Sequence, residues 1–217
     1  MNLKRLLKFI RVLLKMKTIQ DLEIDKINDS HLITINCGFT VYRRVEGDPL
    51  NFRYNDTTFT TAVEPERRQW GASAVNSGNC CMITTVQGAY AETPGIKDRK
   101  LYEITVIKPV ERILDLDKVC KEQGIERRYL HIYDTDDGRD NVKEQELLKL
   151  YGKQIQEKRI HGVRYRSRRL PSDTCFMFYD TLPNLRDYLS YKEIPDPTGL
   201  LGGDLIQIKC DQLRKNP

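Results

Sequence analysis

A cluster of arginines surrounds a single serine in the last third of the sequence. Residues 160–169 read I-H-G-V-R-Y-R-S-R-R, and an apolar run at 175–179 follows. Arginine offers a planar fork of donors that suits phosphate oxygens, and a serine hydroxyl both donates and accepts hydrogen bonds. In this setting Ser167 can be held against a ligand, while its neighbours, among them Arg164 and Arg169, supply positive potential.

Two more polar segments complete a dispersed Arg, Glu, Ser series. Tyr42, Arg43 and Arg44 lie in an extended segment near the start, and Glu92 ends the short segment A-Y-A-E that begins at residue 89. Successive side chains of a strand point to opposite faces, so we expect one of the two arginines to face solvent. We favour Arg43 as the arginine of a site. The alternative interpretation is structural: a surface arginine, a helix-end glutamate and a turn-forming serine.

Several common catalytic motifs are absent from the sequence. It contains no G-x-x-x-x-G-K-[ST] phosphate loop, no G-x-G-x-x-G and no G-x-S-x-G, which counts against nucleoside triphosphatases, dehydrogenases and esterases. Its three histidines have no paired spacing and its six cysteines form no C-x-x-C, so we expect no metal site. The cysteines are interpreted as free thiols in a reducing compartment, and we expect a cytoplasmic protein.

Positive charge is concentrated at the start of the chain. Residues 1–17 carry six cations and no acid, while the formal net charge of all 217 residues is +5, so the remaining 200 residues sum to −1. The body of the protein therefore lacks the general basic charge of a polyanion binder, and we expect no specific nucleic-acid partner.

The same residues, 1–17, predict a basic amphipathic helix. Apolar residues at 3, 6, 7, 10, 13 and 14 recur at helical spacing, and Lys8 and Arg11 interrupt what would otherwise be a signal-peptide core. Such a helix cannot span a bilayer. Two interpretations stay open. The helix docks on the domain or on a second subunit of a homo-oligomer, or it makes peripheral contact with an anionic membrane or an acidic partner.

The rest of the chain alternates short strands with a few helices. Extended segments are expected at 31–37, 39–45, 80–85, 101–107, 112–116, 163–165, 175–179 and 204–208. Helices are expected at 86–92, 117–123 and 141–157, the first of them stopped by Pro94-Gly95. This pattern predicts an α+β fold with a mixed or largely antiparallel sheet.

The Arg, Glu, Ser series resembles the RES-domain family, which is named for these three residue types. Five local patterns are similar, and together they extend roughly over residues 38 to 180. They are the strand ending in Tyr42-Arg43, the segment Arg68-Gln69-Trp70 with Asn76 displaced, the segment 81–92 with Ala89 and Glu92, the element 113–116, and a final turn with Gly162, Val163, Tyr165, Ser167 and Arg169. The final turn is the most specific of the five.

The sequence departs from the family pattern at one position of the expected site. A strand tyrosine is expected eleven residues before the glutamate, where this chain has Cys81. The resemblance implies that this tyrosine stacks on nicotinamide, and Tyr90 and Trp70 are the candidate replacements.

The resemblance implies an ADP-ribosyltransferase-like fold and an NAD-consuming toxin without a metal. Residues 1–30 would form the basic helix and a connector, and 31–217 the NAD-binding catalytic domain. Glu92, Arg43 and Ser167 would be catalytic, and Arg44, Tyr42, Tyr90, Tyr165 and Arg169 would help to bind NAD. We expect cleavage of the nicotinamide–ribose bond, with an antitoxin or immunity protein as partner. Two alternatives are an ADP-ribosyltransferase with a macromolecular target and an inactive NAD-binding or interaction module.

Overall fold

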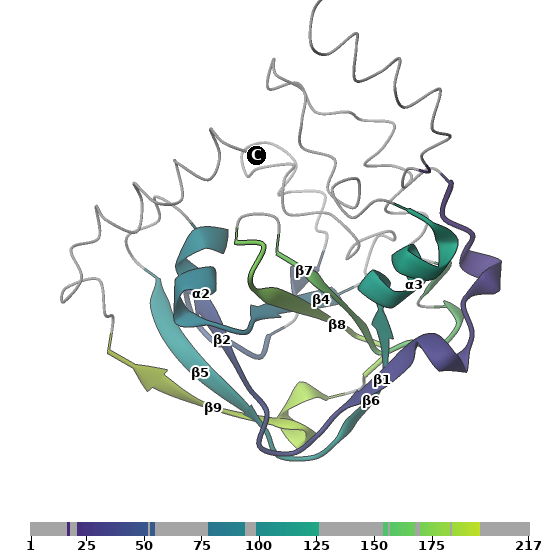
Figure 1. Ribbon diagram of the computed structural model, residues 1–217. Coiled ribbons are helices and arrows are strands. Elements are labelled where there is room, and N and C mark those ends of the chain that lie inside the picture. Colours follow the sequence, from purple (N-terminus) through teal and green to yellow (C-terminus); the bar gives the residue numbers. More distant parts are fainter. Residues whose placement is uncertain are drawn as a thin grey trace, which may run out of the picture.

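The computed structural model describes residues 17, 21–51, 53–54, 78–93, 99–125, 154–155, 157–167, 170–182 and 184–195 (Figure 1). The expected basic helix up to residue 16, the strand at 204–208 and most of the helix at 141–157 lie outside these residues, as do Trp70 and Arg169.

The described strands form one mixed sheet, as the sequence predicts. Its neighbours are antiparallel except β6 and β7, which are parallel, and the short strand β3 (Arg53–Tyr54) pairs with β4 beside the main order. In spatial order the strands are β1 (Leu32–Ile35), β6 (Val110–Asp115), β7 (Gly162–Arg166), β8 (Thr174–Tyr179), β4 (Gly78–Ile83), β2 (Thr40–Val45), β5 (Lys100–Val106) and β9 (Leu189–Ile194).

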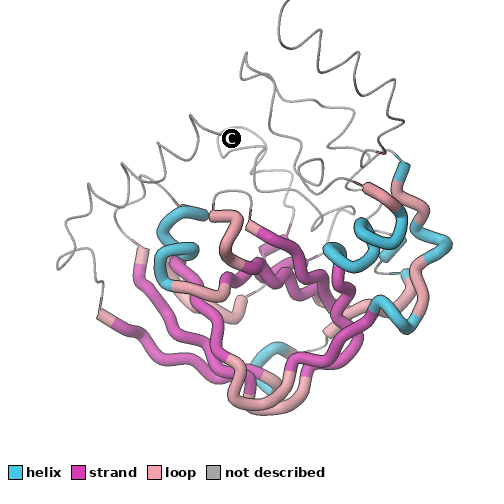
Figure 2. Tube along the Cα trace, in the orientation of Figure 1, coloured by secondary structure: helices cyan, strands magenta, loops and turns pink. Residues whose placement is uncertain are grey.

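The sheet is strongly curled, and the pairing between β2 and β4 in its middle is very short. Strands β2 and β5 pair in register from Thr40↔Thr105 to Val45↔Lys100, whereas β2 and β4 meet at the single pair Tyr42↔Ile83. The strands on either side of this junction diverge into two wings, which the Cα trace shows clearly (Figure 2).

Two short α-helices lie on the same side of the curled sheet (Figure 1). Helix α2 (Val86–Glu92) is capped at its N-terminus by Thr85, whose side chain accepts a hydrogen bond from Gly88 N at 3.0 Å. Helix α3 (Leu116–Gln123) is capped by Asp115 and ends at Gly124, whose positive φ of 70° suits glycine. No helix in the described part of the chain has the length and apolar character needed to cross a membrane.

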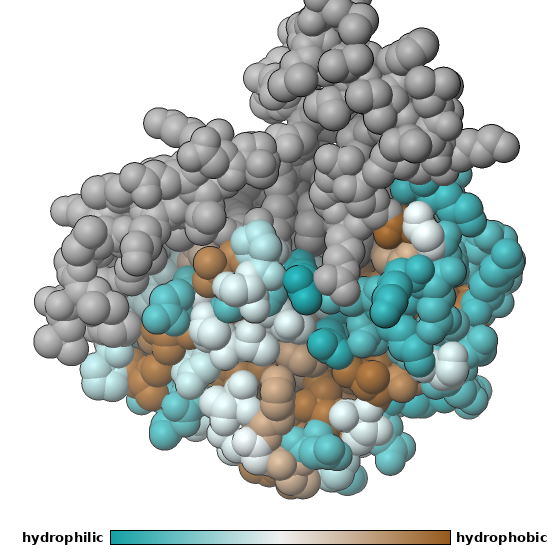
Figure 3. All heavy atoms as spheres, viewed as in Figure 1, coloured by the Kyte–Doolittle hydropathy of each residue, from teal (hydrophilic) through white to brown (hydrophobic). Residues whose placement is uncertain are grey.

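Apolar side chains pack on both faces of the sheet. The helix-side core lies between the sheet and the helices and includes Leu114 and Tyr90, and three residues of the segment before β1 join it: Leu22, Ile24 and Ile27. The far-side core fills the other face and includes Ile104, Phe178 and Leu185. Strand β8 is buried on both faces, which explains its unbroken apolar sequence C-F-M-F-Y. Exposed hydrophilic residues gather over α3 and the neighbouring 3₁₀ turns η2 (Ile24–Lys26) and η3 (Asp29–His31) (Figure 3).

The sequence did not predict one edge of this sheet. Strand β9 and the 3₁₀ turn η7 (Leu185–Asp187) before it were not expected. The cause is the burial pattern of β9, where only Leu189 is buried and four exposed residues follow. An edge strand of this kind lacks the alternation of apolar and polar residues by which a strand is recognised.

The loop before β7 provides a test of the pH dependence of stability. Burial, with the charge of Arg112, lowers the pKa of His161 below its ordinary value of 6.5, and the buried Nδ1 has no hydrogen-bond partner among the described residues. A histidine whose pKa is lowered by folding stabilises the protein above its ordinary pKa, and this stability is lost as the pH falls. We expect melting temperature to drop less between pH 7.5 and pH 5 in His161→Gln than in the parent. Equal drops would contradict this assignment.

Candidate active site

Ser167 and Glu92 meet on the helix side of the sheet. Ser167 Oγ donates a hydrogen bond to Glu92 Oε1 at 2.6 Å, although 75 residues separate the two in sequence. Glu92 is the last residue of α2, and Ser167 directly follows β7. The serine is 2% exposed, so its hydroxyl is held in the protein and away from bulk water. The structure thus joins two of the three residues that the sequence indicated as catalytic.

The tight turn between β7 and β8 fixes the orientation of the serine. Its hydroxyl also accepts a hydrogen bond from Leu170 N at 3.1 Å, and its own amide donates to Asp173 O at 2.9 Å. A hydroxyl that accepts from a backbone amide has its proton directed elsewhere, which here is toward the carboxylate. The local sequence therefore presents Oγ to Glu92 in a defined direction.

The two arginines of β2 point to opposite faces, but neither faces solvent as the sequence led us to expect, because both faces of the sheet are covered and both side chains are buried. The one that shares a face with Glu92 is Arg44. Its guanidinium lies 4.7 Å from the centre of the Tyr90 ring and donates to Thr93 O at 3.2 Å, next to Glu92 in sequence. The stack on Tyr90 is a cation–π contact that keeps the guanidinium at the end of α2.

Arg43, which the sequence favoured, lies in the far-side core instead. Its Nη1 donates to Pro49 O, to Asn51 O at 3.3 Å and to the Cys80 thiol, and the side chain is 7% exposed. Arg43 therefore ties the loop after β2 to β4, and the structure does not bring it together with Glu92 and Ser167.

The three tyrosines proposed for NAD binding all lie on the face of Glu92. Tyr90 and Tyr165 are buried in the helix-side core, and Tyr42 is partly buried against it. The Tyr165 hydroxyl lies 3.8 Å from Cys81 Sγ, so a ring from β7 reaches the position where the family pattern has its strand tyrosine. The small side chain at 81 leaves room for that ring.

Two thiols adjoin the carboxylate on the same face. Cys175 Sγ lies 3.9 Å from Glu92 Oε1, and its hydrogen bond to Cys81 lowers the pKa of Cys81. The same hydrogen bond, together with burial, raises the pKa of Cys175 well above its ordinary value, and burial raises that of Tyr165. The Cys175 thiol therefore stays protonated at neutral pH and does not compete with Glu92 as a negative charge.

The remaining described arginines of the β7 segment pair with acids at the start of α3. Arg164 Nη1 lies 2.9 Å from Asp115 Oδ2, and Arg166 Nε lies 3.5 Å from Asp117 Oδ2. These pairs connect β7 to α3, so Arg164 and Arg166 of the arginine cluster have a structural role. Within the described ranges, no group of three His, Cys, Asp or Glu side chains could hold a metal ion.

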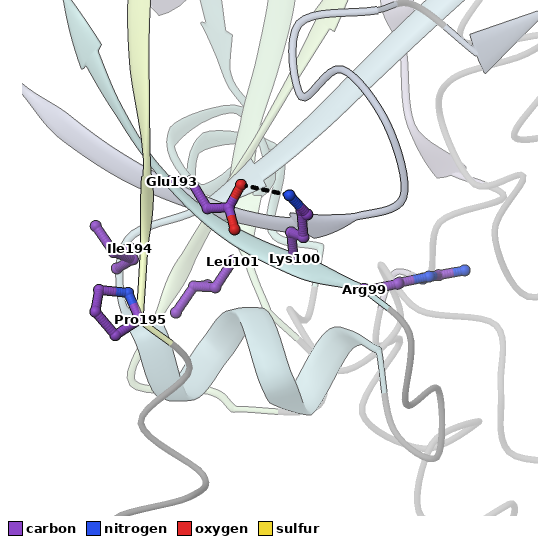
Figure 4. Close-up of a pocket in the computed structure, with 6 residues that line it drawn as sticks. All are labelled: Arg99, Lys100, Leu101, Glu193, Ile194 and Pro195. Atoms are coloured by element: carbon purple, nitrogen blue, oxygen red, sulfur yellow. Dashed lines mark hydrogen bonds and ion pairs between the residues drawn. The ribbon is translucent and has the colours of Figure 1, made fainter.

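An open pocket elsewhere on the sheet does not include this site. It lies where β5 and β9 pair, and Lys100 and Glu193 form a 2.8 Å ion pair across it (Figure 4). Its lining consists of Arg99, Lys100, Leu101, Glu193, Ile194 and Pro195. Glu92, Ser167 and Arg44 are not among these residues, so this pocket is separate from the candidate site, which the contacts of these three residues place at the end of α2.

Sequence reasoning missed the residues that support the site. Thr85 and Asp173 hydrogen bond to each other through their side chains, and Thr93 receives the guanidinium of Arg44. The threonine before 86–92 is a typical helix N-cap, which was a usable signal for Thr85. Asp173 had no such signal because its partner lies 88 residues away.

Comparison with known proteins gives one structural neighbour. No protein-family model matches the chain, and neither does any curated protein. The chain is similar to a chain in the crystal structure of the M. tuberculosis MbcT–MbcA toxin–antitoxin complex, with 12% sequence identity, a TM-score of 0.44, and coverage of 89% of this chain and 96% of that chain. At this identity and TM-score, the assignment of the site depends on the geometry described above.

Proposed function

We propose that this protein cleaves the bond between nicotinamide and ribose in NAD, with Glu92 and Ser167 at the reacting ribose. The observation that carries this proposal is the 2.6 Å hydrogen bond from the buried Ser167 to Glu92. A carboxylate beside a sugar stabilises the positive charge that develops as a glycosidic bond breaks, and a nearby hydroxyl can orient the sugar.

The chemistry needs no strong acid at the leaving group. The nicotinamide ring of NAD is positively charged, so it departs as a neutral molecule when the bond breaks. The burden on the protein is then to stabilise an oxocarbenium-like ribose, for which the charge of Glu92 is suited. This fits a site in which Glu92 lies beside the Ser167 hydroxyl and the Cys175 thiol, and the Arg44 guanidinium binds the carbonyl oxygen of Thr93, the next residue in sequence.

Arg44 takes the role of holding the pyrophosphate in this proposal. It shares a face with Glu92, and a guanidinium fork matches phosphate oxygens. Tyr90, whose ring contacts the guanidinium, and Tyr165, whose hydroxyl lies near Cys81 Sγ, are the aromatic groups that we assign to the nicotinamide and adenine parts of the substrate. A toxin-like role with an antitoxin partner is part of the same proposal, and it follows the resemblance of the final turn to RES domains.

The direct test is nicotinamide release from NAD by the purified full chain, followed by chromatography, with Ser167→Ala and Ser190→Ala as a matched pair. Ser190 is exposed on the edge strand β9, which β5 separates from β2. We expect release by the parent and by Ser190→Ala, and a rate roughly 10²-fold lower in Ser167→Ala, because that variant loses the group that orients the ribose.

The reaction products distinguish hydrolysis of NAD from transfer of ADP-ribose to a target. Free ADP-ribose in step with nicotinamide identifies hydrolysis, whereas label from NAD on a protein of an added lysate identifies ADP-ribosyl transfer. Intact NAD bound without release by the parent, with or without lysate, would refute the proposal and favour the binding module.

A further inference from the structure

We propose that Asp173 is a positioning residue that sets the distance between Glu92 and Ser167. The inference deepens the proposed function and rests on it for its kinetic consequences, but its structural content concerns how two segments of the chain are held together. Asp173 lies at the end of the β7–β8 turn and is 5% exposed.

The backbone of Asp173 holds the serine side of the pair. Its carbonyl oxygen accepts from Ser167 N at 2.9 Å, and its amide donates to Leu170 O at 2.8 Å. Leu170 N in turn donates to Ser167 Oγ at 3.1 Å. These three bonds close the turn around the serine, so the position of Oγ follows the position of Asp173.

The side chain of Asp173 holds the glutamate side of the pair. Its Oδ2 accepts from Thr85 Oγ1, and the same threonine oxygen accepts from Gly88 N at 3.0 Å as the N-cap of α2. Helix α2 has seven residues, and Glu92 is its last. At about 1.5 Å of rise per residue, a displacement of the capped end is transmitted to Glu92 along roughly 10 Å of rigid helix.

Gly88 shows how closely the helix is held to this carboxylate. A β-carbon at position 88 would overlap Asp173 Oδ2 and the side chain of Ile83, so only glycine permits this approach. Beside it, Thr84 and Thr174 exchange two hydrogen bonds of 3.0 Å and extend the pairing of β4 and β8 up to these residues. A single carboxylate therefore joins the helix that carries Glu92 to the turn that carries Ser167.

The first arm of the test uses stability alone. Unfolding free energies of Glu92→Ala, Ser167→Ala and the double variant give the coupling between the two side chains. We expect a favourable coupling in the parent that falls toward zero when the cycle is repeated with Asp173→Ala. An unchanged coupling would overturn the proposal. If Asp173→Ala does not fold, the same cycle is measured in the background of Thr85→Val, which removes the hydroxyl that donates to Asp173. Thr85→Ser, which keeps this hydroxyl, is the control.

The second arm uses nicotinamide release. We expect Asp173→Ala to lower kcat about 10²-fold with KM nearly unchanged, because a misplacement of 1 Å at the reacting centre has an effect of that size. Asp173→Asn, which keeps an acceptor for Thr85, should recover most of the rate, and Asp187→Asn on η7 serves as the matched control. The variant with both Ser167→Ala and Asp173→Ala should be slowed by less than the product of the two single effects, and full additivity would contradict the proposal.

Together, the stability cycle and the kinetic experiment distinguish failure of the positioning role of Asp173 from failure of the proposed function. If the parent releases no nicotinamide but Asp173→Ala abolishes the coupling, the proposed function fails and the positioning role stands. If the parent is active and the coupling does not respond to Asp173, the reverse holds.

Discussion

Glu92→Gln is expected to lower kcat for nicotinamide release by about 10³-fold while the protein keeps its melting temperature within a few degrees. Removal of a single preorganised group that stabilises transition-state charge has an effect of about 10²–10³-fold. The amide oxygen of glutamine can still accept the hydrogen bond from Ser167, which is 2.6 Å long in the parent, so this contact is kept. What the substitution removes is the negative charge that faces the developing cation.

Glu111→Gln is the appropriate control for this measurement. Glu111 is an exposed carboxylate on β6, which β7 and β8 separate from β4 in the sheet, and the substitution makes the same chemical change. We expect this variant to retain the rate of the parent. If Glu92→Gln retained more than a tenth of the parental rate, the charge of Glu92 would not be the stabilising group, and its contact with Ser167 would be structural.

The second large effect concerns the two adjacent arginines, which the structure separates by role. Arg43→Met should lower the free energy of unfolding by about 3 kcal/mol, because the carbonyl oxygens of Pro49 and Asn51 lose a charged donor in a buried setting. Arg44→Met should instead raise the KM for NAD by at least about tenfold, because the guanidinium at the end of α2 is the proposed pyrophosphate ligand. Methionine keeps the apolar stem of both side chains in place.

The comparison needs chemical denaturation and saturation kinetics on the same two proteins. Arg43→Met, assayed at a temperature where it is folded, should have a KM close to that of the parent. The opposite result, a raised KM in Arg43→Met and an unaltered one in Arg44→Met, would return the role of site arginine to Arg43. Loss of stability alone in both variants would assign both arginines to the fold.

Much of the fold follows from local sequence. The expected extended segments correspond to strands β1, β2, β4, β5, β6, β7 and β8 within a few residues at each end, and the helices at 86–92 and 117–123 correspond to α2 and α3. These elements were predictable because each carries its own signals, such as apolar β-branched runs, the caps Thr85 and Asp115, and Gly124 at a helix end. Strand β9 carries no such signal and depends on its pairing with β5.

The types of residue at the candidate site also come from the sequence, whereas their grouping comes from the tertiary structure. Ser167 and Glu92 were indicated by the arginine-rich turn and the end of a short helix. The sequence could not decide between Arg43 and Arg44. The alternation of side chains along a strand places the two on opposite faces of the sheet, but it does not show which face α2 covers. That face is decided by the curl of the sheet and by the packing of α2 over the junction of β2 and β4. Asp173 belongs to the tertiary structure entirely, because its role exists only where a turn and a helix cap, distant in sequence, are brought into contact.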